Sequence, residues 1–154
     1  MTVKDDLKAA LTTAMKARDE VALSSLRQAL SAISVAETAG AELVELSDDQ
    51  VLKVLASEVK KHHESADAFE TAGRAEKVAS ERAEAAVLEA YLPAALSEAE
   101  IRALVDAEVA AAAAEGTTGM KAMGKVVSAV RARAGSTADG AAIAALVKAA
   151  LGAG

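Results

Sequence analysis

The chain has 154 residues, a formal net charge of −6 and 53% hydrophobic residues, enough to bury the core of one ordinary domain or of two small ones. It has no cysteine, which excludes disulfides, thiol nucleophiles and cysteine-ligated zinc or iron–sulfur sites. Trp is absent, and Phe69 and Tyr91 are the single Phe and the single Tyr. Aliphatic and alanine side chains must therefore fill the core, which favours closely packed helices over a sheet.

The first residues, "MTVKDDLK", do not form the basic region and apolar segment of a secretory signal. The longest apolar runs, "VAAAAA" and "AAIAALV", are far shorter than the roughly 20 residues of a membrane-spanning helix. We therefore expect a cytoplasmic protein that has no membrane partner.

Two helices are predicted before residue 41. The first opens near Lys4 after Thr2 as its N-cap, and "ARDE" then indicates a break. Asp19 is placed to cap the second helix, which should end near Gly40. One face of each helix is apolar: Leu7, Leu11 and Met15 in the first, and Leu23, Leu26, Leu30 and Ile33 in the second.

Two further helices are predicted before residue 92. Ser47 and Gln50 have the spacing of a capping box, so a third helix should begin there and stop near Gly73. A fourth runs from about Ala75 to Ala90, and most of its surface is polar.

The two histidines of the chain, His62 and His63, are adjacent on the third predicted helix. There His62 would lie beside Glu58 and His63 beside Asp67, each four residues away. Adjacent helical positions point about 100° apart, so the two rings would not converge on one ion. We expect exposed histidines that pair with neighbouring carboxylates, and no metal site.

A domain boundary is predicted at Pro93, the single proline of the chain, because proline interrupts a helix. Ser97 and Glu100 again have capping-box spacing. Three helices follow, at about 98–115, 119–133 and 140–151, the last capped by Asp139. No segment alternates like a strand. The expected fold is all-α, with an N-terminal helical domain (1–92) and a small C-terminal three-helix domain (93–154).

Charge is distributed unevenly along the chain. Residues 1–115 carry 12 Lys or Arg and 22 Asp or Glu, whereas residues 116–154 carry 5 basic residues and one acid. A polarity of this kind indicates a locally basic face on an otherwise acidic protein.

The segment 119–133, "GMKAMGKVVSAVRAR", contains four cations and no anion. On a helical wheel its apolar residues share one face, Lys121 and Lys125 lie opposite, and Arg131 and Arg133 flank the apolar arc. One interpretation is an ordinary solvated helix. The other is an RNA-binding surface, in which these cations contact phosphates and the glycines permit close approach of the backbone. The candidate RNA-binding residues are Gly119, Lys121, Gly124, Lys125, Arg131 and Arg133.

No catalytic constellation is recognisable in the chain. A glycine-rich phosphate loop and a "GxSxG" motif are absent, and the spacing of the carboxylates singles out no acid–base pair. We predict no catalytic residue and no cofactor, and catalysis by this chain alone is disfavoured. With two isolated aromatic residues, a stacking platform for single-stranded RNA is also disfavoured, which leaves backbone recognition of a structured RNA.

Several segments resemble the GatB/YqeY family in their sequence and order: "SLRQALSAIS", "SEVKKHHESADAFETAGRAE", "YLPAALSEAEI", "GMKAMGKVVSAV" and "ADGAAIAALVKAAL". The most specific parts are the Tyr-Leu-Pro junction, the Met-Gly-Lys of the basic segment and the Asp-Gly before the last helix. The resemblance covers nearly the whole chain. It implies a two-part helical architecture similar to the C-terminal half of the B subunit of the tRNA-dependent amidotransferase, which amidates glutamate or aspartate misacylated on tRNA with glutamine as nitrogen donor.

This resemblance implies a tRNA-binding or accessory protein. Its partners would be tRNA and an amidotransferase or an aminoacyl-tRNA synthetase. The chain has no counterpart of the cradle domain that holds the metal and nucleotide in that subunit, so carbon–nitrogen ligase activity is implied by association alone. Two alternatives stay open: a helical protein-interaction module with an acidic N-terminal domain, and, last on chemical grounds, a ligase that uses glutamine as amide donor.

Overall fold

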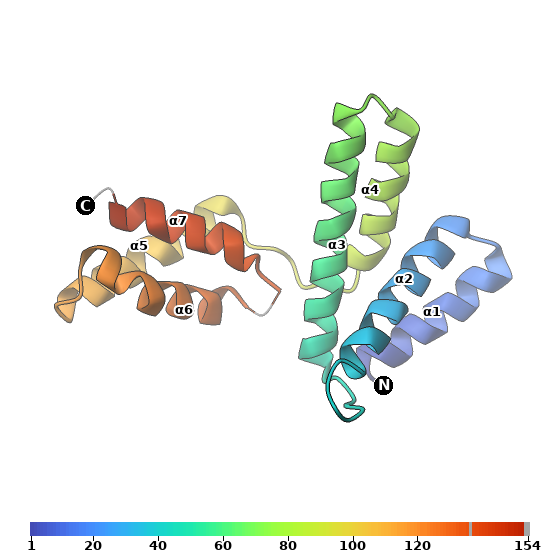
Figure 1. The fold of residues 1–154 in the computed structure, drawn as a ribbon, viewed down its shortest axis with the longest axis horizontal. Coiled ribbons are helices and arrows are strands. Elements are labelled where there is room, and N and C mark those ends of the chain that lie inside the picture. Colours follow the sequence, from blue (N-terminus) through green and yellow to red (C-terminus); the bar gives the residue numbers. More distant parts are fainter. Residues whose placement is uncertain (136, 153–154) are drawn as a thin grey trace. The chain divides into compact units, whose positions relative to one another are not determined.

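A computed structural model describes residues 1–135 and 137–152, and this part of the chain consists of helices and the turns and loops between them. The predicted all-α fold is confirmed (Figure 1). The chain forms two compact units, Met1–Leu92 and Pro93–Gly154, and each is described below by itself.

The N-terminal unit contains four helices, α1 to α4. Helices α3 and α4 form a long antiparallel hairpin that turns at Gly73, where φ is +73° and a side chain would be strained. Helix α2 packs against α1 on one side and against α3 and α4 on the other. The four helices are α1 (Val3–Ala17), α2 (Glu20–Glu37), α3 (Asp48–Thr71) and α4 (Ala75–Glu89).

Side-chain caps begin three of these helices, as predicted. The hydroxyl of Thr2 accepts from the Asp5 N–H, and the Asp5 carboxylate accepts from the Thr2 N–H. Ser47 and Gln50 form the same reciprocal pair at α3. Each cap satisfies backbone N–H groups that have no partner inside the helix. Helix α2 starts after Asp19, whose carboxylate accepts from the Ala22 N–H.

The core of the N-terminal unit is aliphatic. Met15, which the sequence places on the apolar face of the first helix, is 54% exposed, and the buried residue of that turn is Ala14. At 100° per residue Ala14 points within about 20° of Leu7, whereas Met15 points about 80° away. The buried apolar residues are Leu7, Ala14, Leu23, Leu26, Ala29, Ile33, Val51, Leu55 and Leu88.

Helix α2 ends at Glu37, three residues before the predicted end, because this residue organises the following loop. Its buried carboxylate accepts from Lys4 Nζ at 2.5 Å and from the Leu46 N–H at 3.2 Å. Its carbonyl oxygen accepts from the Val44 N–H. The Lys4 hydrogen bond, with that of Leu46, holds the pKa of Glu37 below its ordinary value.

The C-terminal unit contains the three predicted helices, α5 (Glu98–Ala114), α6 (Met123–Ala134) and α7 (Gly140–Gly152). The predicted second helix is divided, because Gly119–Ala122 form a short 3-10 helix, η1, before α6 begins. The core of the C-terminal unit consists of Val105, Ala112, Ala122, Val126, Val130, Ile143, Val147 and Leu151.

The predicted caps of the C-terminal unit are also present. Ser97 and Glu100 form a capping box at the start of α5. The Asp139 carboxylate accepts from the Ala141 N–H at 3.0 Å and from the Ala142 N–H at 3.4 Å. Within the described residues, no helix combines the length and the apolar character needed to cross a membrane.

Candidate nucleic-acid interface and histidine cluster

Helix α6 buries one side against α5 and α7 through Val126 and Val130, and Ala122 of η1 is buried with them. The side opposite these residues is exposed. We call it the basic face: it consists of Lys121, Gly124, Lys125, Ser128 and Arg131, which lie three or four positions apart along η1 and α6 and are all exposed. Ser128 was not among the residues predicted from the sequence.

Two of the four predicted cations have carboxylate partners. Lys125 forms an ion pair with Glu115, the C-cap residue of α5, and Arg133 Nε lies 2.8 Å from Glu108 Oε1. Arg133 stands at the edge of α6 that faces α5 rather than on the basic face. The absence of anions within 119–133 therefore does not mean an absence of counter-charge, because α5 supplies two from outside the segment.

The other two cations, Lys121 and Arg131, form no ion pair within the described part of the chain, and both are exposed. The guanidinium of Arg131 lies over the first turn of α7, where a Cβ on Gly140 would be 3.3 Å from Arg131 Cζ. The basic face is thus a small cationic surface made by one free lysine, one paired lysine and one arginine beside α7.

The two predicted site glycines differ in what the fold requires of them. Gly119 has a φ of +64°, a left-handed conformation that favours glycine. Gly124 lies within α6, its φ is not left-handed, and a Cβ added there would meet nothing within 4 Å. The backbone conformation therefore explains why residue 119 is a glycine. No contact or torsion within the described chain explains why residue 124 is a glycine.

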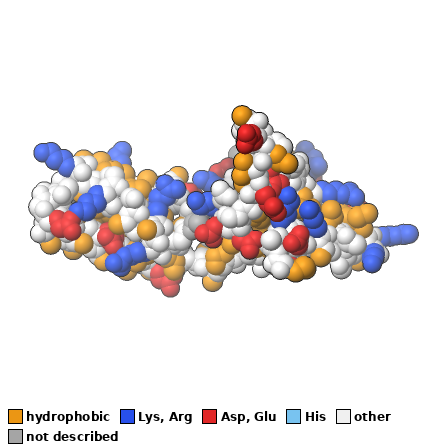
Figure 2. Space-filling view, turned by 90° about the horizontal axis from the view of Figure 1, so that it is seen from below, with side chains coloured by type: hydrophobic (Ala, Val, Ile, Leu, Met, Phe, Trp, Pro, Cys, Tyr) orange, Lys and Arg blue, Asp and Glu red, His pale blue; other side chains and the backbone are white. Residues whose placement is uncertain are grey.

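The net charge of residues 93–154 is zero, with six Lys or Arg and six Asp or Glu. On the face drawn in Figure 2, basic side chains lie among acidic ones, without a broad area of one sign among the described residues in view. Any anion that binds the basic face must therefore be held by the placement of a few charges rather than by a strong overall field.

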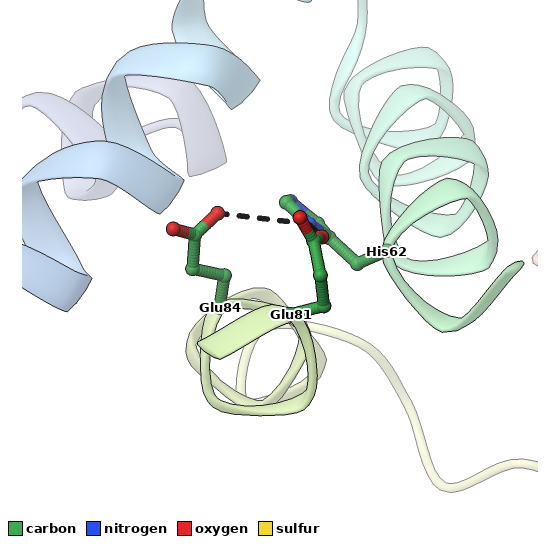
Figure 3. A group of neighbouring side chains, drawn as sticks. All are labelled: His62, Glu81 and Glu84. Atoms are coloured by element: carbon green, nitrogen blue, oxygen red, sulfur yellow. Dashed lines mark hydrogen bonds and ion pairs between the residues drawn. The ribbon is translucent and has the colours of Figure 1, made fainter. Parts of the chain in front are cut away.

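The predicted exposure of both histidines is wrong for His62. His62 is 5% exposed, and its Nδ1 lies 2.7 Å from Glu81 Oε2 and 3.6 Å from Glu84 Oε2 (Figure 3). Both carboxylates belong to α4, so the partner is not Glu58 of the same helix, which instead pairs with Lys61. Because α4 packs along this side of α3, the facing helix supplies closer partners than the neighbouring turn does.

His63 is half-buried on the adjacent side of α3. Its Nε2 lies 2.6 Å from Glu89 Oε1, and its Nδ1 lies 3.2 Å from a guanidinium nitrogen of Arg82. The expected partner, Asp67, pairs with Arg82 instead, at 3.0 Å. The two histidines thus belong to separate clusters, as their divergent directions predict.

The His62 cluster was missed from the sequence, although a signal for it is present. His62 and Glu84 stand at equal distances along the chain from Gly73, the residue at which the α3–α4 hairpin turns. Residues placed symmetrically about such a turn lie at the same level on the two helices of an antiparallel pair. Glu81 lies three positions before Glu84 and shares its face of α4.

The comparisons with known proteins identify the family of the chain. A family model described as "Yqey-like protein" matches residues 4–151, nearly the entire chain. A search of curated proteins finds no match. Because this match spans nearly the whole chain, the chain is a member of the YqeY-like protein family.

Proposed function

We propose that this protein binds tRNA through the phosphate backbone, with the basic face of the C-terminal unit as the contact surface. In this proposal the protein is a tRNA-binding accessory of tRNA amidation or aminoacylation, an assignment supported by the resemblance of the chain to the helical part of the amidotransferase B subunit. No catalytic step is assigned to the chain itself.

The observation that carries the proposal is the exposed row of Lys121, Gly124 and Lys125. One turn of helix presents two ammonium groups with a glycine between them, and the fold itself does not use the missing side chain of Gly124. A residue without a side chain lets a bulky polyanion approach the helix backbone while the flanking ammonium groups reach its phosphate oxygens. Arg131, one turn or two farther along, extends the surface for a second phosphate.

The net charge of residues 93–154 is zero, and this limits how strongly the tRNA affinity should depend on salt. A complex held by the three cations of the basic face should weaken with salt, and each phosphate contact contributes roughly 0.7 to 0.9 to the slope of log affinity against log salt. A total slope of about 2 to 3 is therefore expected, rather than the steep dependence of a polycationic protein.

The test is a charge reversal, Lys121→Glu with Lys125→Glu. Both side chains lie opposite the buried face of α6, so the variant should fold and bind tRNA more weakly, with a slope flatter by one contact per lost lysine. The matched control reverses two exposed lysines of the N-terminal unit, Lys53→Glu with Lys77→Glu, and changes the net charge by the same amount. Affinity is measured by filter binding or fluorescence anisotropy at several salt concentrations.

Circular dichroism on the same samples separates lost binding from lost structure. Lys121→Glu alone is a second variant, because it leaves the Lys125–Glu115 pair intact. Equal affinity of the folded double variant and the parent at low salt would contradict the proposal. Equal weakening in the Lys53/Lys77 control would show a general charge effect and would contradict the assigned surface.

A further inference from the structure

The N-terminal unit contains a chemically distinct cluster of side chains. It lies on α3 and α4, whereas the basic face lies on η1 and α6. His62 projects from α3 towards Glu81 and Glu84 of α4, with the three side chains converging in Figure 3. One ligand-type atom from each residue lies within 4.8 Å of those of the other two. Glu84 is also held by α2, because Gln28 Nε2 donates to its carboxylate at 3.1 Å.

The charge of this cluster is not balanced. Among the described side chains, the His62 ring is the sole basic group within ion-pair distance of either carboxylate. The neighbouring His63 cluster differs, because Arg82 brings a permanent positive charge to it. Two carboxylates beside one imidazole, on partly buried side chains, leave a negative charge that a cation would compensate.

The histidine itself gives an independent indication. His62 is only 5% exposed, yet its Nε2 has no hydrogen-bond partner among the described atoms. The other nitrogen, Nδ1, faces two carboxylate oxygens at once. An N–H at Nδ1 satisfies at most one of them, whereas a cation bound at Nδ1 would contact both carboxylates. In that arrangement Nε2 carries the ring hydrogen, so the indication comes from Nδ1 and the two carboxylates that it faces.

We propose that His62, Glu81 and Glu84 bind one divalent transition-metal cation that joins α3 to α4. An imidazole nitrogen with two carboxylate oxygens is a ligand set for zinc-type or manganese-type ions, whereas magnesium and calcium prefer oxygen alone. The fourth position would be filled by water, to which the 26% exposed side chain of Glu81 gives access.

The distances are close to those of such a site. Ligand bonds of about 2.1 Å in a tetrahedral arrangement place ligand atoms about 3.4 Å apart. Glu84 Oε2 is already 3.6 Å from His62 Nδ1, and Glu81 Oε2, at 2.7 Å, needs to move by less than about 1 Å. The sequence predicted no metal site because two adjacent histidines of one helix cannot converge on one ion. The site proposed here uses one histidine of α3 and two glutamates of α4.

The experiment uses the full chain without a histidine tag, stripped of metal by a chelator. Zn²⁺ is titrated calorimetrically, and thermal unfolding is followed through the fluorescence of Tyr91. This is the single tyrosine in a chain without tryptophan, and it packs against the core of the N-terminal unit. We expect one Zn²⁺ per chain and a rise in Tm of about 10 °C or more at a hundredfold excess over Kd.

Two conservative variants, Glu81→Gln and Glu84→Gln, keep the side-chain shape and should each weaken Zn²⁺ binding by about tenfold or more. His63→Gln and Glu89→Gln make the matched changes in the adjacent cluster and should leave the affinity unchanged. His62→Gln should abolish Zn²⁺ binding. If the His62→Gln protein does not fold, Glu81→Gln and Glu84→Gln still test the site.

Three outcomes would overturn the proposal: no stoichiometric Zn²⁺ binding, binding that survives both glutamate variants, or binding lost in His63→Gln. An equal stabilisation by Mg²⁺ would also overturn it, because a general attraction to acidic side chains would then suffice.

Discussion

Arg133 Nε of α6 lies 2.8 Å from Glu108 Oε1 of α5, although 25 positions separate the two residues in the chain. With the Lys125–Glu115 pair, this contact joins the basic helix to the acidic helix of its own unit. Part of the positive charge of α6 thus serves the packing of the C-terminal unit. The part that remains for a ligand is the basic face, with Lys121 and Arg131 at its ends.

Because Glu115 is paired with Lys125, we expect that replacing Glu115 with an uncharged residue strengthens tRNA binding. Glu115→Gln releases Lys125 for phosphate and should raise tRNA affinity by up to about fivefold, since an exposed pair is worth at most about 1 kcal/mol. Glu98→Gln is the matched control, because it releases Arg102 at the other end of α5. Anisotropy titrations at one salt concentration measure both, and an equal gain in both variants would contradict the role of Lys125.

Gly124 allows the needs of the fold to be separated from those of a ligand. Gly124→Ala places a methyl group in open space within a helix, so it should stabilise the chain by roughly 0.5 kcal/mol. The same methyl group stands where the phosphate backbone is proposed to approach, so tRNA affinity should fall. Urea unfolding and tRNA titration on one preparation test both.

Gly119→Ala is the contrasting variant. Its φ of +64° is unfavourable for alanine, so it should lose about 1 kcal/mol or more of stability. Should Gly124→Ala gain stability and bind tRNA as tightly as the parent, close approach at this helix is ruled out.

The two compact units predict where proteases will cut. The segment 92–97 and the loops around Gly116 and Gly135 are the expected sites of first cleavage, since exposed linkers are nicked before packed helices. Trypsin cannot test the first of them, because no Lys or Arg lies between Arg82 and Arg102. Elastase, which cuts after alanine, with mass spectrometry of the fragments, is suitable. First cleavage within 50–70 would contradict the two-domain prediction.

Acid should weaken the loop between α2 and α3 through Glu37. The Lys4 and Leu46 hydrogen bonds lower the pKa of Glu37 in the folded protein, so its stabilising effect is complete above the ordinary value of about 4.3. That effect is lost as the pH falls through the lowered, folded pKa. The Tm of the parent should therefore exceed that of Glu37→Gln at pH 6, and the difference should shrink towards pH 3.

Calorimetric scans of both proteins across this range make the comparison. Subtracting the variant removes the background from other carboxylates, including Asp5 and Glu76, whose pKa values are also lowered. A difference in Tm that does not change with pH would show that Glu37 acts through its shape alone.

Local chemistry made the helix starts predictable. Thr2, Ser47 and Ser97 each cap a helix through hydrogen bonds to a residue three positions later, so the sequence contains every group involved. The exposure of Lys121 and Lys125 was predictable for a similar reason: the helical period assigns them to the side opposite Val126 and Val130. By itself, then, the sequence determined that the chain is helical, where most helices begin and which side of α6 faces away from the core.

Only the tertiary structure decided which helix covers which face. His62 is buried because α4 returns along α3 and brings Glu81 and Glu84 to its ring. Helical periodicity says which residues share a face, but it contains no information about the element packed against that face. The neutralisation of Lys125 and Arg133 has the same origin, because their partners lie on α5 and at its end. Ion pairs act over a few ångströms in space, so partners that are distant in the chain meet only once the helices have packed.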